Sequence, residues 1–287
     1  MPHRPWPFLI IAISLLLLAC SGGPPISESS KAFTDAGNNL KFSDFDGALS
    51  NLDKAIKSAK DESFRQQALV LRTALVTALA DASRQMAEAY YTGAQKPAAQ
   101  SHSNAFYKVR SDYYSTANTF LMDALQAAMN QRSKLSGNTI PMEVSLPSFT
   151  GTNAGLTKIK EGQFVSDSDR LSAELQADRY AFAVVLSTIA GAGQDPNKGQ
   201  AAFSSGKVDV DPRVYLIELS NSFLKTGAMF ESSGISQPDR LRTLNEVVHG
   251  NLDVALKLLA SKPDKDLEAR AKKMQADCDK TLKKLPK

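Results

Sequence analysis

Apolar residues recur at spacings of three and four along most of this chain, which is the pattern of amphipathic helices. The pattern is most regular in two long segments, 62–91 and 98–134. Alternating apolar and polar runs, which are typical of strands, are scarce, and β-branched residues do not cluster. The sequence therefore predicts an all-α fold.

Glycines, prolines and short polar segments mark the ends of the predicted helices. Pro97, Pro212 and Pro238 stand in first turns, where a missing N–H loses no helical hydrogen bond, and Gly93 ends the first long helix. From these signals we expect helices over 31–39, 44–60, 62–91, 98–134, 168–190, 212–230, 237–260 and 264–284.

Two stretches, 136–165 and 191–209, lack a helical period and contain several glycines and prolines. We expect both to be loop-rich, because these residues punctuate regular structure. The first stretch is expected to hold a short strand or turn near 142–146.

Small and large apolar residues alternate in a specific order in the first predicted helical hairpin, and again after Gly250. These positions are Ala36, Phe45, Ala48, Leu52 and Ala55, then Leu252, Ala255 and Leu259. Their offsets resemble the tetratricopeptide repeat, in which alanines let paired helices approach closely and larger residues fill the groove between hairpins. The resemblance implies an α-solenoid.

The resemblance to this repeat is incomplete. Ala32 and Asn39 stand where the first helix of the repeat has aromatic residues, and Lys262 replaces the last alanine of the second copy. No period of about 34 residues connects the two copies. An irregular helical bundle with alanine-rich contacts therefore remains the alternative to a solenoid.

The N-terminal segment 1–19 has the layout of a secretory signal peptide, with Arg4 followed by an apolar run from Phe8 to Ala19. The run is too short to cross a hydrocarbon core of about 30 Å as a helix. It ends in Leu-Leu-Ala before Cys20, which resembles the lipobox of bacterial lipoproteins.

Membership of the lipoprotein class implies cleavage before Cys20, a thioether-linked diacylglycerol on its sulfur, and a further acyl chain such as palmitate on the new amine. Two or more acyl chains hold a protein stably at a membrane. Ser21 implies sorting to the outer membrane, facing the periplasm, because an Asp at this position resembles an inner-membrane retention signal. Residues 20–30 are expected to form a flexible tether, and 31–287 the helical domain.

The sequence contains two cysteines, so lipidation of Cys20 leaves Cys278 without a disulfide partner. Its acidic neighbours, Asp277 and Asp279, are expected to raise its thiol pKa, which argues against a reactive thiolate. We interpret Cys278 as an incidental cysteine.

The net charge and the lack of catalytic motifs argue against several classes of function. A formal net charge of +4 is too balanced to favour nucleic acid as a partner. After the signal peptide the histidines are His102 and His249, and no metal-binding spacing or nucleophile elbow accompanies them. Ser222 and Lys225 fit a Ser-x-x-Lys spacing without its companion motifs. We therefore predict no catalytic residue, metal or cofactor.

Five of the seven tyrosines lie where the first long helix ends and the next begins. With a neighbouring phenylalanine, the cluster comprises Tyr90, Tyr91, Phe106, Tyr107, Tyr113 and Tyr114. Consecutive positions on a helix differ by about 100°, so adjacent rings cannot face one core. Some rings are therefore expected to line a groove for a partner or ligand; the alternative is that the cluster caps the hairpin as core.

These features predict a non-enzymatic, membrane-anchored periplasmic scaffold that binds a protein or peptide partner in envelope assembly or transport. They resemble tetratricopeptide-type lipoproteins. A small-ligand-binding accessory of a periplasmic transporter is the second hypothesis, and a cell-wall enzyme is the third. The partner's identity and the oligomeric state are open.

Replacing the lipidation residue tests the anchor. Cys20→Ala should move the protein from the membrane fraction to the soluble fraction and abolish its labelling by a palmitate analogue, because both depend on the sulfur of Cys20. Fractionation and labelling of cells measure this. Cys278→Ala is the control and should change neither readout, whereas a membrane-bound Cys20→Ala protein would contradict lipidation.

Overall fold

The structure is a computed structural model that describes residues 27–144, 146–148, 152–204, 206–232 and 237–286. Cys20 and the signal peptide lie outside the described residues. The described chain is mostly helical, and its fold is all-α as predicted. Its α-helices are α2 (Glu28–Lys41), α3 (Phe45–Ser58), α4 (Glu62–Ala94), α5 (Ser103–Arg132), α6 (Ala154–Lys160), α7 (Asp167–Ile189), α8 (Pro196–Ser204), α9 (Pro212–Gly227), α10 (Met229–Ser232), α11 (Pro238–Ser261) and α12 (Lys265–Lys284).

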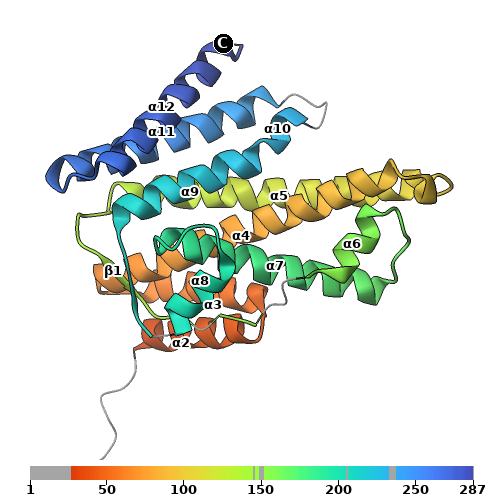
Figure 1. Cartoon of the computed structure of the whole chain (residues 1–287). Helices are drawn as coiled ribbons and strands as arrows, with labels where there is room; N and C mark the ends of the chain where they lie inside the picture. The colour runs from red at the N-terminus through yellow and green to blue at the C-terminus, as the bar shows by residue number, and fades with distance from the viewer. Residues whose placement is uncertain (1–26, 145, 149–151, 205, 233–236, 287) are drawn as a thin grey trace, which may run out of the picture.

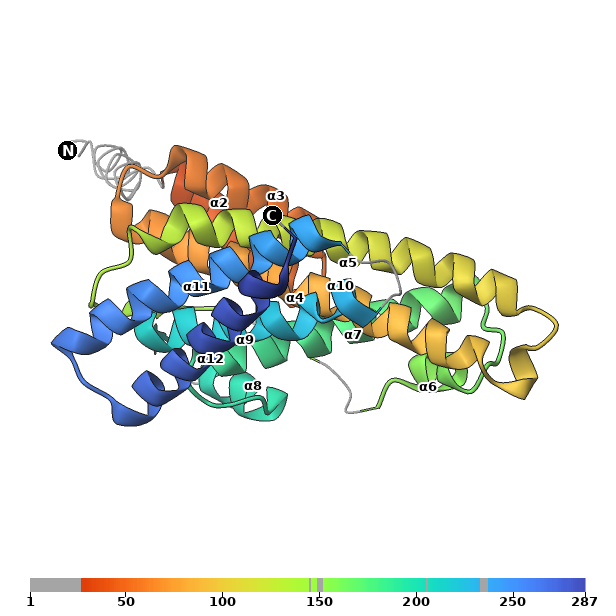
Figure 2. The same cartoon turned by 90° about the horizontal axis from the view of Figure 1, so that it is seen from above.

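The helices stack in antiparallel pairs. In Figure 1 the α2–α3 hairpin lies at the bottom, α4 with α7 and α5 with α9 form the middle, and α11 with α12 lies at the top. Figure 2 shows the same molecule from above, where the α4–α5 hairpin extends on the right beyond α9 and α11. A 3-10 turn, η1 (Pro97–Ala99), lies at the tip of this hairpin.

All eight predicted helices are present, with ends that differ from the prediction by a few residues. The two stretches expected to be loop-rich contain helices α6 and α8, so this expectation was wrong in part. The glycines inside these two helices, Gly155 and Gly199, do not interrupt them. A Cβ on Gly155 would lie 2.7 Å from the Cβ of Ala173, and one on Gly199 would lie 2.6 Å from the Cβ of Ser187. These glycines therefore let the short helices lie directly against α7.

A two-stranded antiparallel sheet joins the same two stretches. Strand β1 (Ile140–Met142) pairs with β2 (Val208–Val210), and Ile140 lies opposite Val210. The strand expected near 142–146 thus begins two residues earlier. Its partner lies in the second loop-rich stretch, where sequence reasoning expected no strand.

Helix α4 is the centre of the fold and contacts α3, α5, α6, α7 and α9. Every residue from Thr73 to Ser83 is buried, although the apolar spacing of the sequence predicts one buried face. The hydroxyls of Thr73 and Thr77 donate to the carbonyls one turn earlier, at 2.8 and 2.7 Å. These bonds satisfy the polar side chains without a partner from another helix.

An ion-pair cluster connects α4 to the helices on either side. The guanidinium of Arg72 donates to Asp53 of α3 at 2.6 Å and to both carboxylate oxygens of Asp123 of α5 at 3.0 and 3.1 Å. Arg72 is largely buried, so this paired geometry fixes the positions of α3 and α5 more firmly than an exposed ion pair would.

The first repeat-like hairpin is formed by α2 and α3. Ala36, Phe45, Ala48, Leu52 and Ala55 are all buried in it, as predicted. The side chain of Asp44 caps α3 by accepting from the backbone N–H of Gly47 at 3.0 Å. This segment is therefore a closely packed helical hairpin.

The second repeat-like segment lies inside one continuous helix. Gly250 is part of α11, in agreement with the helix predicted over 237–260, and Leu252, Ala255 and Leu259 are buried. The guanidinium of Arg132 lies against the helix backbone at this glycine. A Cβ on Gly250 would lie 2.0 Å from that guanidinium, which donates to the carbonyl of Val247 at 3.3 Å.

The described helices include none whose length and hydropathy would suit a membrane span.

Two glycines inside helices should respond oppositely to alanine. A Cβ on Gly93 would lie 2.0 Å from the carbonyl oxygen of Ile159 on α6, whereas nothing lies within 4 Å of a Cβ on Gly37 in α2. Gly93→Ala should therefore lower the free energy of unfolding by about 1–3 kcal/mol through overpacking. Gly37→Ala should raise it by up to about 1 kcal/mol through helix propensity. Urea denaturation of the purified proteins measures both, and a stabilised Gly93→Ala variant would contradict the close contact between α4 and α6.

Candidate functional site

The aromatic cluster at the α4–α5 junction divides into two faces. Tyr90, Phe106 and Tyr113 are buried, whereas Tyr91 is 43% exposed and Tyr107 is 41% exposed. The adjacent tyrosines of α4 thus point in different directions, as the angle between consecutive helical positions predicts. One half of the cluster is core, and the other half lies on the surface.

The buried rings attach the α4–α5 hairpin to α7. The rings of Tyr90 and Tyr113 stack with centroids 5.8 Å apart, and Phe106 meets Tyr90 edge-on at 5.2 Å. The Tyr113 hydroxyl donates to the carboxylate of Glu174 on α7 at 3.2 Å. Burial raises the pKa of Tyr113 far above its ordinary value, so this hydroxyl remains a donor. These rings have a structural role.

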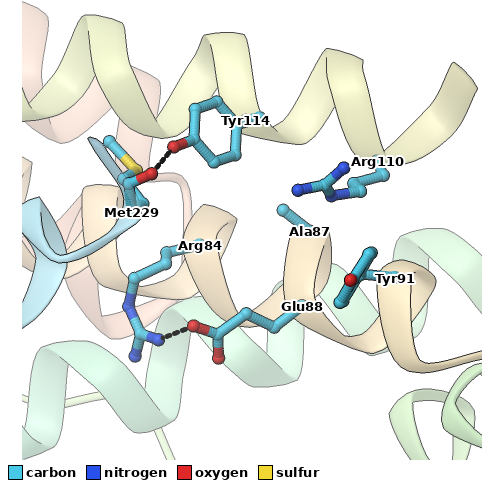
Figure 3. A pocket seen from close by; sticks show the side chains of 7 residues that line it. All are labelled: Arg84, Ala87, Glu88, Tyr91, Arg110, Tyr114 and Met229. Atoms are coloured by element: carbon cyan, nitrogen blue, oxygen red, sulfur yellow. Dashed lines mark hydrogen bonds and ion pairs between the residues drawn. The ribbon is translucent and has the colours of Figure 1, made fainter. Parts of the chain in front are cut away.

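The exposed half lines a surface pocket of about 220 Å³ between α4, α5 and α10, shown in Figure 3. We call it the α4–α5 pocket. Its residues on each long helix follow helical spacing and so share one face. The lining residues are Arg84, Ala87, Glu88 and Tyr91 from α4, Arg110 and Tyr114 from α5, and Met229 from α10.

Arg110 lies against two aromatic rings at this pocket. Its guanidinium carbon is 4.5 Å from the ring centroid of Tyr91 and 5.9 Å from that of Tyr114. Figure 3 shows Arg110 and Tyr91 facing each other from the two helices. Cation–π contacts of this kind position a guanidinium while its edge keeps its N–H donors.

The other charges of the pocket wall are paired. Arg84 forms ion pairs with Glu88 and, at 2.7 Å, with Asp81, whose second oxygen lies 3.6 Å from the ammonium of Lys225. Burial opposes the charge of Arg84, but Asp81 and Glu88 raise its pKa above the ordinary value. Arg84 is therefore a fixed cation held by neighbouring carboxylates.

One end of the pocket is closed by a contact between α5 and α10. The Tyr114 hydroxyl donates to the backbone carbonyl of Met229, as Figure 3 shows. This bond places Tyr114 and Met229 side by side as an apolar wall. Tyr107 lies outside the pocket but continues its aromatic surface, with its ring centroid 6.4 Å from that of Tyr91.

Sequence reasoning identified the tyrosines of this site but not its cations or Met229. Arg110 lies three residues after Tyr107 and four before Tyr114, so helical spacing alone could have assigned it to the same face. The same rule assigns Arg84, which lies seven residues before Tyr91, to the face of α4 that carries Tyr91. Met229 carries no such signal, because it reaches the pocket from a distant part of the chain.

The remaining candidates for chemistry lie elsewhere. Within the described ranges no three His, Cys, Asp or Glu side chains are placed to hold a metal ion. His249 lies between two carboxylates, 3.3 Å from Asp253 and 3.4 Å from Asp279. Cys278 is buried, and burial together with Asp279 and Asp277 raises its pKa to about 11. The predicted rise in its pKa is confirmed, and burial is the larger cause.

Comparison with known proteins gives no relative: no family model, curated protein or solved structure matches this chain. The site is therefore interpreted from its own geometry.

Asp178 on α7 has a pKa raised to about 8, mainly because its carboxyl is removed from water and further because Glu174 and Asp46 repel its charge. Between about pH 4 and pH 8 the unfolded chain releases this proton while the folded protein keeps it. Stability should therefore fall as the pH rises through this range and level off above it.

Substitution of Asp178 tests this effect. Asp178→Asn should raise the urea midpoint above that of the wild type at about pH 8, and the difference should shrink towards pH 4, where both side chains are neutral. The test is the urea midpoint of each protein measured across this pH range. Asp112→Asn, which replaces an exposed carboxylate of α5, is the control. A difference between Asp178→Asn and wild type that does not change with pH would contradict the raised pKa.

Proposed function

We propose that this protein is a lipid-anchored helical scaffold of the bacterial envelope, and that the exposed face of its α4–α5 hairpin binds a protein partner. The observation that carries the proposal is the α4–α5 pocket with Tyr91, Tyr107, Arg110 and Tyr114 at the surface. Tyrosine, arginine and methionine are enriched in protein interfaces, where they act as anchors within a small central patch.

The size of the pocket favours a protein partner over a small ligand. Pockets that enclose drug-sized molecules typically measure about 300–1,000 Å³, whereas the α4–α5 pocket measures about 220 Å³. This space suits one or two side chains of a partner that rests on the surrounding helix surface. The proposed activity is binding, without a catalytic step.

Rigid support for the pocket also favours binding. The buried rings on the opposite face of the same helices hold α4 and α5 against α7. The exposed rings therefore lose little conformational freedom when a partner binds, and this lowers the cost of association.

The lipid anchor proposed at Cys20 fits this arrangement. Helix α2, where the described chain begins, lies at the left in both Figure 1 and Figure 2, whereas the tip of the α4–α5 hairpin lies at the right. A tether entering at α2 would hold the domain at the outer membrane from the end away from this tip. The pocket would then face partners in the periplasm.

Site-specific crosslinking tests the binding face. A photo-crosslinking amino acid at position 107, beside Tyr91, should capture one partner in intact cells, identifiable by mass spectrometry. Tyr91→Ala in the same protein should reduce the yield about tenfold or more, because truncating an aromatic anchor commonly costs more than 2 kcal/mol of binding.

Tyr180→Ala is the matched control for this experiment. Tyr180 is 39% exposed, close to the exposure of Tyr91, but it lies on α7 outside the α4–α5 pocket. Its substitution should leave the crosslink unchanged. Equal yields from Tyr91→Ala and wild type would show that this face is not the binding surface.

A further inference from the structure

Within the part of the chain that the structure describes, Arg110 makes no ion pair or hydrogen bond. Its guanidinium lies against the rings of Tyr91 and Tyr114. The residues outside the described ranges contain no Asp or Glu. The donors of Arg110 are therefore open to a carboxylate of another molecule.

The neighbouring carboxylates of the pocket are paired with other cations, and neither forms an ion pair with Arg110. Glu88 is bound to Arg84, and Asp81 is shared by Arg84 and Lys225. Arg110 is half-buried, so its charge is only partly hydrated. Two aromatic faces compensate in part for the lost water, but they leave the in-plane N–H donors of the guanidinium unused.

The remainder of the pocket is apolar. Ala87 forms its floor on α4, and the Tyr91 ring, the Tyr114 ring and Met229 form its walls. A ligand that matches this surface places an anionic group at Arg110 and an apolar group beside it. A polypeptide does so with an acidic residue next to an apolar one.

A carboxylate matches the charge of this pocket. The charged residues that line it are Arg84, Glu88 and Arg110, two cations and one anion, so their formal charge is +1. One carboxylate balances this charge, whereas a doubly charged phosphate leaves an excess of negative charge. A planar carboxylate also accepts two parallel hydrogen bonds from a guanidinium.

We infer that the α4–α5 pocket recognises an acidic segment of the partner protein, with an Asp or Glu carboxylate on Arg110 and an adjacent apolar side chain against Tyr91, Ala87 and Met229. The inference rests on the proposed binding function of this face. It makes Arg110 the residue that selects the partner.

An array of hexapeptides, acetylated and amidated so that their ends carry no charge, tests the inference with the full-length lipoprotein in detergent. Peptides with Asp or Glu beside Leu, Phe or Met should bind the wild type most strongly. Their Asn or Gln counterparts should bind about tenfold more weakly, because they cannot form a charged pair with Arg110.

Variants of the protein separate Arg110 from general charge effects. Arg110→Gln should weaken binding of the acidic peptides about tenfold and remove the preference for them. Arg110→Lys should restore only part of it, because lysine lacks the planar pair of donors. Lys108→Gln removes the same charge from an exposed position of α5 outside the pocket, and should leave the preference intact. Circular dichroism melts check that all three variants remain folded.

The outcomes distinguish this inference from the proposed function. One outcome would contradict the acidic partner but leave the proposed binding face intact: Tyr91→Ala weakens peptide binding and crosslinking, while Arg110→Gln and Lys108→Gln have equal effects. A crosslinking yield that does not change on Tyr91→Ala would contradict the proposed binding face itself. A wild-type protein that binds no peptide, or prefers neutral or basic ones, would also contradict the inference.

Discussion

The whole fold depends on the burial of α4. A helix that is buried on every side from Thr73 to Ser83 needs neighbours around its full circumference, and α3, α5, α7 and α9 supply them. Alanines on α4 allow these helices to approach, and its threonine hydroxyls bond to its own backbone rather than remain unsatisfied. Arg72 then fixes two of the neighbours through Asp53 and Asp123. The order of the surrounding helices follows from the need to cover this one.

The α4–α5 pocket lies where α4 is no longer covered on every side by other helices. Beyond Ser83, one side of α4 still packs against α7, and there Tyr90 and Tyr113 form part of the core. On the other side α9 ends at Gly227, and α10 covers only the start of the exposed face through Met229. Helices α4 and α5 thus present a core surface to α7 and an aromatic surface to solvent. A binding face built on such packed helices is held in place before any partner arrives.

Helical periodicity was sufficient to predict the main helices and the division of the aromatic cluster, because both depend on local geometry. The adjacent residues Tyr90 and Tyr91 had to point apart, and they do. The glycines were harder to interpret. Gly155, Gly199 and Gly250 are typical of breaks in structure, yet each lies in a helix where another part of the chain approaches its backbone. Such contacts are not local, so the sequence pattern does not reveal them. For the same reason it did not reveal the strand pairing of Ile140 with Val210, or Met229 in the pocket.

Arg110 differs from three other arginines that the fold largely buries and pairs with carboxylates. Arg72 has Asp53 and Asp123, Arg84 has Asp81 and Glu88, and Arg213 has Asp211. The Arg72 pairs join α4 to α3 and α5, the Arg84 pairs lie within α4, and Asp211 caps α9. These charges therefore contribute to the fold itself. Removing a cation from water without a carboxylate is unfavourable, and two tyrosine rings offset only part of that cost at Arg110. The fold gains no ion pair from this arrangement. A binding partner that brings a carboxylate would gain a donor already oriented for it, and we therefore propose that Arg110 serves recognition rather than stability.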